Sequence, residues 1–282
     1  MGLNFIKRIT QIRDLLNIVI KKIDDDKGIK VNQFLSEHLF NNPKYTLSKR
    51  LNKYECQIFS QNGEDGIIQE IFNRIGLTNK YFVEFGVENG LECNSTNLLY
   101  KDWSGLWIEG SHDFCNQISG RFKDIIDGSR LKIQNEFITA ENIQLIFDGA
   151  NVPSEPDLLS IDIDYNDYYV WKAITKYQPR VVVIEYNSIF RPDTHFVVKY
   201  NPKRIWDKTS YFGASLLALE QLGDEKGYHL VGCVFSGSNA FFVRKDLVGD
   251  LFEYPYSAEN HYEPNRDFLL YKTGHPKNHI DE

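Results

Sequence analysis

The sequence is short of the features by which several classes of protein are recognised. It has four cysteines in 282 residues, without CxxC spacing, so neither a zinc site nor a disulfide framework is indicated. Reduced thiols in a cytoplasmic protein are the expectation. No apolar run approaches the ~18 residues of a transmembrane helix. Charges interrupt the apolar residues near the start and no small-residue cleavage site follows, so we expect no signal peptide.

Long basic runs are also missing. The 32 Lys and Arg residues are outnumbered by 39 Asp and Glu, which gives a formal net charge of −7 and predicts no nucleic-acid partner. The phosphate-binding pattern GxxxxGK[ST] does not occur, which argues against an ATP-binding loop. Hydrophobic residues make up 42% of the chain, enough for a sizeable core in one large domain or in one domain with an appendage.

Residues 1–53 are predicted to form an N-terminal helical extension. Apolar residues spaced alternately four and three apart form a seam along one helix face, and the acidic run at 24–28 is expected to end that helix. Three uses of the seam remain open: packing against the chain's own domain, pairing in a homodimer, or contact with a membrane through flanking basic residues. The seam consists of Phe5, Ile9, Ile12, Leu16, Val19 and Ile23.

Residues 54–282 alternate between strand-like and helix-like segments. Apolar runs at 81–86, 105–110, 130–138, 157–164 and 180–187 are separated by stretches with helical spacing. This alternation predicts an α/β fold, a mostly parallel Rossmann-like sheet with helices on both faces. Two later strands, at 228–235 and 239–246, are close enough in sequence to form an antiparallel hairpin, and the helix before them is expected to end at Gly223 or Gly227.

The ends of the first two strands indicate a cationic ligand. Ligands of open parallel sheets bind at the carboxyl ends of the strands. The first strand ends in "VEFGVENG", where glycines permit a tight turn but the acids would repel a pyrophosphate. S-adenosylmethionine, with a sulfonium, an ammonium and no phosphate, suits such a site. Glu109 ends the second strand about 20 residues later, where a carboxylate can accept both ribose hydroxyls. Ordinary solvated strand-end acids are the competing interpretation.

The fourth and fifth strands end in groups suited to a metal ion. Asp162 and Asp164 lie two apart after one strand, and Glu185 and Asn187 lie two apart after the next. Residues two apart on a strand share a face, so these four are expected to converge. Hard oxygen ligands favour Mg²⁺, Mn²⁺ or Ca²⁺ over zinc. Alternatively, an acid of this run caps the following helix, and both interpretations can hold together.

Several segments in this order resemble the FkbM-type S-adenosylmethionine-dependent methyltransferases. The resemblance covers about residues 54–190 through "SQNGEDGIIQEIF", "YFVEFGVENGLECNSTNLLYKDWSGLWIEG", "LLSIDIDYND" and "PRVVVIEYN". It implies a class I methyltransferase fold and an O-methyltransferase that acts on a hydroxyl, often of a sugar or a polyketide. It also implies cofactor contacts to Glu84, Gly86, Gly90 and Glu109. Within the same segments we take Gln61, Glu64, Asp65, Asn94 and Asp162 as further candidate cofactor-binding residues.

The sequence departs from that family after the fourth strand, where "IDIDYND" stands in place of "IDVEG". This departure resembles the metal-dependent O-methyltransferases, with Asp162, Asp164, Glu185 and Asn187 as metal ligands. The candidate catalytic residues are Asp164, Asp167 and His195. A loop with Arg191, Tyr200, Lys203, Arg204 and Trp206 is the candidate acceptor-binding segment. The alternatives are a metal-dependent enzyme of other chemistry on this fold, or a non-catalytic binding or assembly module.

Overall fold

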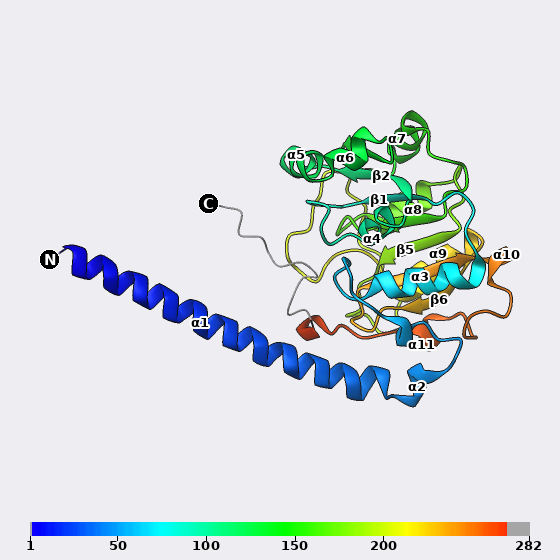
Figure 1. The fold of residues 1–282 in the computed structure, drawn as a ribbon. Helices are drawn as coiled ribbons and strands as arrows, with labels where there is room; N and C mark the ends of the chain where they lie inside the picture. Colours follow the sequence, from blue (N-terminus) through cyan, green and yellow to red (C-terminus); the bar gives the residue numbers. More distant parts are fainter. Residues whose placement is uncertain (1, 270–282) are drawn as a thin grey trace.

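The structure, a computed structural model, describes residues 2–269, with side chains described from residue 7 onward. A seven-stranded sheet forms its centre, in the order β3-β2-β1-β4-β5-β7-β6. The first five strands are parallel, and β7 runs antiparallel to both β5 and β6. The expected fold class, a mostly parallel α/β sheet with an antiparallel hairpin, is confirmed (Figure 1).

The five parallel strands alternate with helices as the apolar runs predicted. Each strand begins and ends within about three residues of its apolar run, because short runs of Val, Ile, Leu and Phe favour buried strands. The elements are α3 (Glu64–Ile75), β1 (Tyr81–Phe85), α4 (Thr96–Leu99), β2 (Ser104–Glu109), α5 (His112–Arg121), α6 (Lys123–Asp127), β3 (Leu131–Asn135), α7 (Ile143–Ala150), β4 (Leu158–Ile161), α8 (Asp167–Ala173) and β5 (Val181–Glu185).

Two hydrophobic cores lie on opposite faces of the sheet. Successive strand residues point to opposite faces, so in β1 Val83 joins one core and Phe82 the other. Residues of α7, α8 and α9 (Leu216–Glu225) fill the first core, and residues of α3, α4 and α5 fill the second. With both faces covered in this way, the carboxyl ends of β1, β2, β4 and β5 are the place where polar side chains can gather.

The C-terminal hairpin completes the sheet. It consists of β6 (Tyr228–Cys233) and β7 (Asn239–Arg244), and β7 lies between β5 and β6. Helix α9 ends at Glu225, and Gly227 follows it with a φ of 87°, so the second of the two expected stops is the one used. Short helices α10 (Lys245–Val248) and α11 (Ala258–His261) and the 3-10 turn η3 (Asp267–Leu269) follow.

The N-terminal helix is longer than the sequence predicted. Helix α1 spans Gly2–Leu35, through the acidic run and Gly28, so the expectation that residues 24–28 end it was wrong. Three consecutive aspartates on an exposed helix are solvated and do not interrupt the backbone hydrogen bonds. Its last turn is held by packing: the Phe34 ring centroid lies 6.3 Å from that of Phe235 and 5.3 Å from that of Phe268.

The part of α1 that is N-terminal to this last turn projects from the body as a rod (Figure 1). The residues from 7 to 27 are all exposed, so the described part of the seam does not pack on its own domain; the Phe5 side chain lies outside the described residues. None of the helices within residues 2–269 combines the length and hydrophobicity needed to cross a bilayer.

Short elements join α1 to the body. They are the π-helical turn η1 (Ser36–Phe40), α2 (Pro43–Thr46) and the 3-10 turn η2 (Asn52–Tyr54). Leu39, Tyr45 and Leu51 among them are buried, and Leu51 belongs to the core that α3 covers. The division of the chain at residue 54 stays a prediction, and residues 270–282 of its second part lie outside the described residues.

Candidate functional site

A cavity of about 480 Å³ opens at the carboxyl ends of the parallel strands. Its walls come from the segments that follow β1, β2, β3 and β4, from the end of β5, from the segment before α3, from the loop before α9 and from the start of β7. Nine carboxylates line it against one basic residue, Arg204, so a cationic ligand is favoured there. The nine are Glu64, Glu84, Glu88, Glu92, Glu109, Glu136, Asp162, Asp164 and Glu185.

The floor of the cavity depends on a glycine at the end of β1. Gly86 has a φ of 74°, and a Cβ atom built on it would lie 1.6 Å from the carbonyl oxygen of Asp162. Only glycine permits this approach of the β1 end to the β4 end. Gly90, with a φ of 79°, does not line the cavity: a Cβ atom there would lie 2.8 Å from the Trp107 ring, so this glycine serves packing.

Glu84 holds the loop that follows β1. Its carboxylate accepts hydrogen bonds from the backbone N–H groups of Asn94 and Ser95, at 2.8 and 2.9 Å, and from the hydroxyls of Ser95 and Ser160. Burial raises the pKa of Glu84, and these hydrogen bonds oppose the rise. Asn94, which also lines the cavity, donates from its amide to Ser160. Both predicted residues therefore lie at the cavity and also shape its wall.

Glu109 ends β2 with both carboxylate oxygens directed at backbone N–H groups. Oε2 accepts from Glu88 at 2.8 Å and Oε1 from Ser111 at 2.7 Å. Each oxygen keeps a second acceptor site, since a carboxylate offers about four lone-pair positions. Glu109 is therefore fixed at the cavity wall and still able to accept hydrogen bonds from a ligand.

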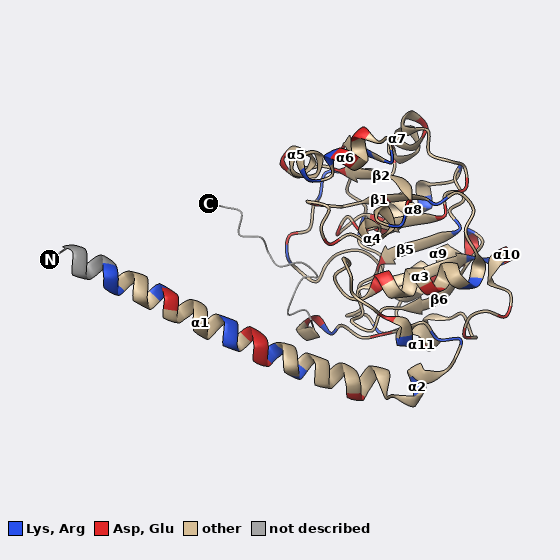
Figure 2. Ribbon diagram, viewed as in Figure 1, with Lys and Arg blue, Asp and Glu red and all other residues tan. Residues whose placement is uncertain are grey.

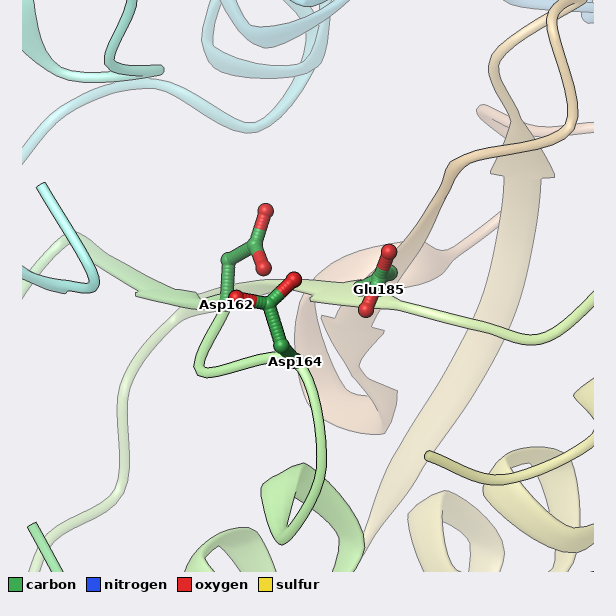
Figure 3. Close-up of side chains that lie close together, drawn as sticks. All are labelled: Asp162, Asp164 and Glu185. Atoms are coloured by element: carbon green, nitrogen blue, oxygen red, sulfur yellow. The ribbon is translucent and has the colours of Figure 1, made fainter. Parts of the chain in front are cut away.

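Three carboxylates from the β4 and β5 ends meet in the cavity. One ligand atom each of Asp162, Asp164 and Glu185 lies within 4.8 Å of the others. Figure 3 shows the two aspartates on the turn after β4 and the glutamate on the neighbouring strand. Burial and the neighbouring carboxylates raise the pKa of Asp162 and of Glu185, and burial raises that of Asp164. The buried Glu185 Oε2 has no hydrogen-bond partner among the described residues.

Asp164 adopts a φ of 63°, a left-handed conformation that Asp tolerates better than most residues. Asp167, at the start of α8, accepts a hydrogen bond from the Ile163 N–H at 2.8 Å and so closes the turn. Burial raises the pKa of Asp167 to about 6. Asn166 occupies the N-cap position, but its amide donates to the Asn201 carbonyl and caps nothing.

Two other predicted residues lie away from the acid cluster. The Asn187 amide donates to the carbonyls of Ser210 and Phe212, and its oxygen accepts from the Ile189 N–H. It does not line the cavity, because β5 ends at Glu185 and the strand alternation no longer applies two residues later. His195 is exposed and also does not line the cavity.

The acids of the segment before α3 divide into two roles. Glu64 lines the cavity and accepts hydrogen bonds from the Asn62 backbone and from the Asn239 amide. Asp65 does not line it: its Oδ2 accepts from three successive backbone N–H groups, those of residues 58 to 60, and so fixes the turn. Gln61 lines the cavity, 3.3 Å from Glu92.

The candidate acceptor loop contributes Arg204 and Trp206 to the lining. Arg204 lies over the Tyr165 ring, 5.2 Å from its centroid. Trp206 is partly exposed and donates from its indole to the Thr209 carbonyl at 2.7 Å. Arg191, Tyr200 and Lys203 do not line the cavity.

Sequence reasoning missed several lining residues. Glu136 and Phe137 follow β3, and the rule that ligands meet strand ends would have found them had it been applied to that strand. Asn239 begins β7, and nothing local in the sequence places it beside Glu64. Its position depends on the insertion of β7 next to β5.

Comparisons with known proteins yield structures and no sequence relatives. No family model matches the sequence, and no curated protein matches it. The FkbM resemblance therefore stays a prediction.

The structural neighbours include proteins described as methyltransferases. The N-terminal domain of EvdMO1, solved in the presence of SAH and D-fucose, is 12% identical over 64% of this chain and 80% of that chain, with a TM-score of 0.42. A methyltransferase from Clostridium acetobutylicum is 10% identical over 76% of this chain and 98% of that one, with a TM-score of 0.40. The methyltransferase domain of bacterial CtHen1 is 12% identical over 65% of this chain and 97% of that chain, with a TM-score of 0.40. Values this low do not indicate a shared reaction.

Proposed function

We propose that the protein is an S-adenosylmethionine-dependent O-methyltransferase, assisted by a divalent cation, that acts on a hydroxyl of a sugar or glycoconjugate. The observation that supports this most directly is the lining of the cavity, nine carboxylates against one arginine. A sulfonium and an ammonium group are stabilised by such a lining, whereas a nucleotide phosphate is repelled. The resemblance to FkbM-type enzymes implies the same reaction.

The residues present fit the cofactor in size and in chemistry. A cavity of about 480 Å³ is within the usual range of ligand sites. Glu109 keeps free acceptor positions beside the glycine turn, which suits a ribose diol, and Glu84 adds negative charge in the same wall. S-adenosylmethionine supplies a methyl group on a sulfonium, so the acceptor hydroxyl has to be held in line with it and to lose a proton.

The acid cluster fits a divalent cation. Burial raises the pKa of all three carboxylates, neighbouring carboxylates raise it further in Asp162 and Glu185, and one Glu185 oxygen is buried without a partner among the described residues. Such a donor set is the kind that a hard cation neutralises. Asp162, Asp164 and Glu185 would hold the ion, and such an ion lowers the pKa of a bound hydroxyl. Asp164 is the exposed member, and we assign it the contact with the acceptor hydroxyl and the removal of its proton.

Calorimetric titration of S-adenosylmethionine tests the cofactor site. Wild type should bind, and Glu109→Gln should weaken binding about 10- to 100-fold because a charged acceptor to the ribose is lost. The matched control is Asp113→Asn, an exposed carboxylate nearby on α5 that does not line the cavity; its affinity should stay within about threefold of wild type. Failure of wild type to bind would reject the methyltransferase and leave a metal-dependent enzyme of other chemistry.

Titration of Mg²⁺ or Mn²⁺ in the presence of the cofactor tests the cation site separately. We expect one binding event in wild type, abolished by Glu185→Gln or Asp164→Asn and retained in Asp193→Asn, an exposed loop acid outside the cavity. If wild type binds S-adenosylmethionine without any response to these ions, the cation part is wrong and the methyltransferase part stands.

A further inference from the structure

The free part of α1 presents a broad apolar surface. Eight aliphatic side chains between residues 9 and 23 are each more than half exposed, and seven of them face one side of the helix. At 100° per residue they cover an arc of about 140° on the helix, wider than the two positions per heptad of a coiled-coil seam. They are Ile9, Ile12, Leu15, Leu16, Val19, Ile20 and Ile23.

Cations border this arc in a chain that is acidic overall. Residues 7–22 contain five Lys or Arg residues and one Asp, although the whole chain has a formal charge of −7. Lys22 projects just outside one border of the arc and Arg13 just outside the other, and Arg8 projects just inside the border next to Lys22. Figure 2 shows blue basic bands along the projecting helix, with red acidic bands and uncharged stretches between them. A partner for this surface therefore has to combine apolar and negatively charged groups.

A second copy of the helix is a poor match. In a parallel pair that uses the Ile9–Ile12–Leu16 seam, Arg8 of one helix lies opposite Arg13 of the other, and like charges at these positions disfavour pairing. Leu15 of one helix lies opposite Ile20 of the other in the same pair, so the charged positions are what disfavour it. A lipid surface covers the full arc, and anionic headgroups neutralise both borders.

We propose that α1 lies in the interface of an anionic lipid bilayer, with the apolar arc in the acyl boundary and Arg8, Arg13 and Lys22 at the headgroups. Phe34, packed on Phe235 and Phe268, then holds the enzyme body at the membrane surface. This inference goes beyond the proposed reaction and does not depend on it, because it requires neither cofactor nor cation binding.

Flotation of the full-length protein with vesicles tests the proposal. Vesicles of phosphatidylcholine with 30% phosphatidylserine should carry the protein upward, and vesicles of phosphatidylcholine alone should carry at least about tenfold less, since each basic residue near an anionic surface contributes to binding. Arg8→Gln combined with Lys22→Gln should lower the partition coefficient at least about tenfold. Binding equal on the two vesicle types, or absent from both, would overturn the proposal.

Two variants of one helix provide the matched comparison. Leu16 and Ile18 are 55% and 53% exposed, but only Leu16 lies within the arc. Leu16→Glu should lower vesicle binding about tenfold or more, and Ile18→Glu, with the same change of charge, should lower it severalfold less. Equal losses would overturn the proposal. So would a dimer in light scattering that Leu16→Glu dissociates while vesicles bind neither form, because the arc would then be a contact between two copies.

Discussion

Trp206 lines the cavity and is 42% exposed, so the proposed sugar acceptor would meet its indole. An aromatic face suits the apolar face of a sugar ring, so Trp206→Ala should raise the KM for a sugar acceptor about tenfold. Trp206→Phe keeps an aromatic face and should stay within about threefold of wild type. Both variants should bind S-adenosylmethionine as wild type does in calorimetry. Equal KM values for the two variants would argue against stacking.

Because His261 is buried, we expect the free energy of unfolding to fall in mild acid. Burial, with the positive charge of Arg50 nearby, lowers the pKa of this histidine to about 3, and its Nε2 contacts the Glu253 carbonyl at 3.1 Å. The unfolded chain, with an ordinary histidine pKa near ~6.5, binds more protons between pH 3 and 6.5, so this residue's contribution falls as pH falls.

The measurement is urea unfolding of wild type and His261→Gln at pH 7 and pH 5. Between these two values the wild type should lose about 2 kcal/mol more than the variant. Carboxyls with raised pKa values, such as that of Asp167, stabilise the folded state as pH falls and so oppose the effect of His261. Both proteins contain them, so their contributions cancel when the loss in the variant is subtracted from the loss in wild type. Parallel losses in the two proteins would show that His261 is protonated as readily in the folded state.

At the scale of elements, the junction of β1 and β4 determines where the acids lie. Gly86→Ala would place a methyl group against the Asp162 carbonyl in a backbone conformation with positive φ. Gly76, which follows α3, has a φ of 73° with a ψ of 173°, and a methyl group added to it would meet nothing within 4 Å, so Gly76→Ala measures the cost of a positive φ without any contact.

We expect Gly76→Ala to lower the free energy of unfolding by about 1–3 kcal/mol, and Gly86→Ala to lower it by about 1–3 kcal/mol more. Urea unfolding measures both values. Equal losses in the two variants would mean that the end of β4 shifts to accommodate the methyl group at little cost. The position of Asp162 would then not depend on its contact with Gly86.

The strands and their ends show which parts of the fold and of the candidate site could be predicted from the sequence. Short apolar runs predicted the parallel strands, and the rule of strand ends predicted Glu84, Glu109 and Asp162 at one cavity. The two-residue alternation was less reliable beyond the strand: β4 ends at Ile161 and β5 at Glu185. Asp164 therefore reaches the cluster through a left-handed turn, and Asn187 is directed to loop carbonyls.

The position at which α1 ends could not be predicted from the charged residues in its sequence. Its continuation past residue 28 depends on the packing of Phe34 against residues about 200 positions later. Such contacts follow from the tertiary fold and leave no local pattern. The same holds for Asn239 in the cavity lining.

At the scale of the whole molecule, the projecting rod and the body should be independent in stability. Because residues 7–27 are exposed, removal of residues 1–26 should leave the free energy of unfolding of the body within about 0.5 kcal/mol of wild type. Leu39→Ala, in the buried segment that follows, should lower it by about 2–4 kcal/mol. A large loss from the truncation would show that the rod contacts the body in solution.

The insertion of β7 between β5 and β6 has a consequence for synthesis on the ribosome. Until residue 244 has emerged, the edge of β5 is unpaired, and a row of valines and isoleucine with free backbone groups stands open to other chains. A nascent chain that already holds the first five strands is therefore prone to aggregate, and it needs either rapid elongation or a chaperone over this interval. The last strand made, β7, is the one that joins β6 to the parallel strands.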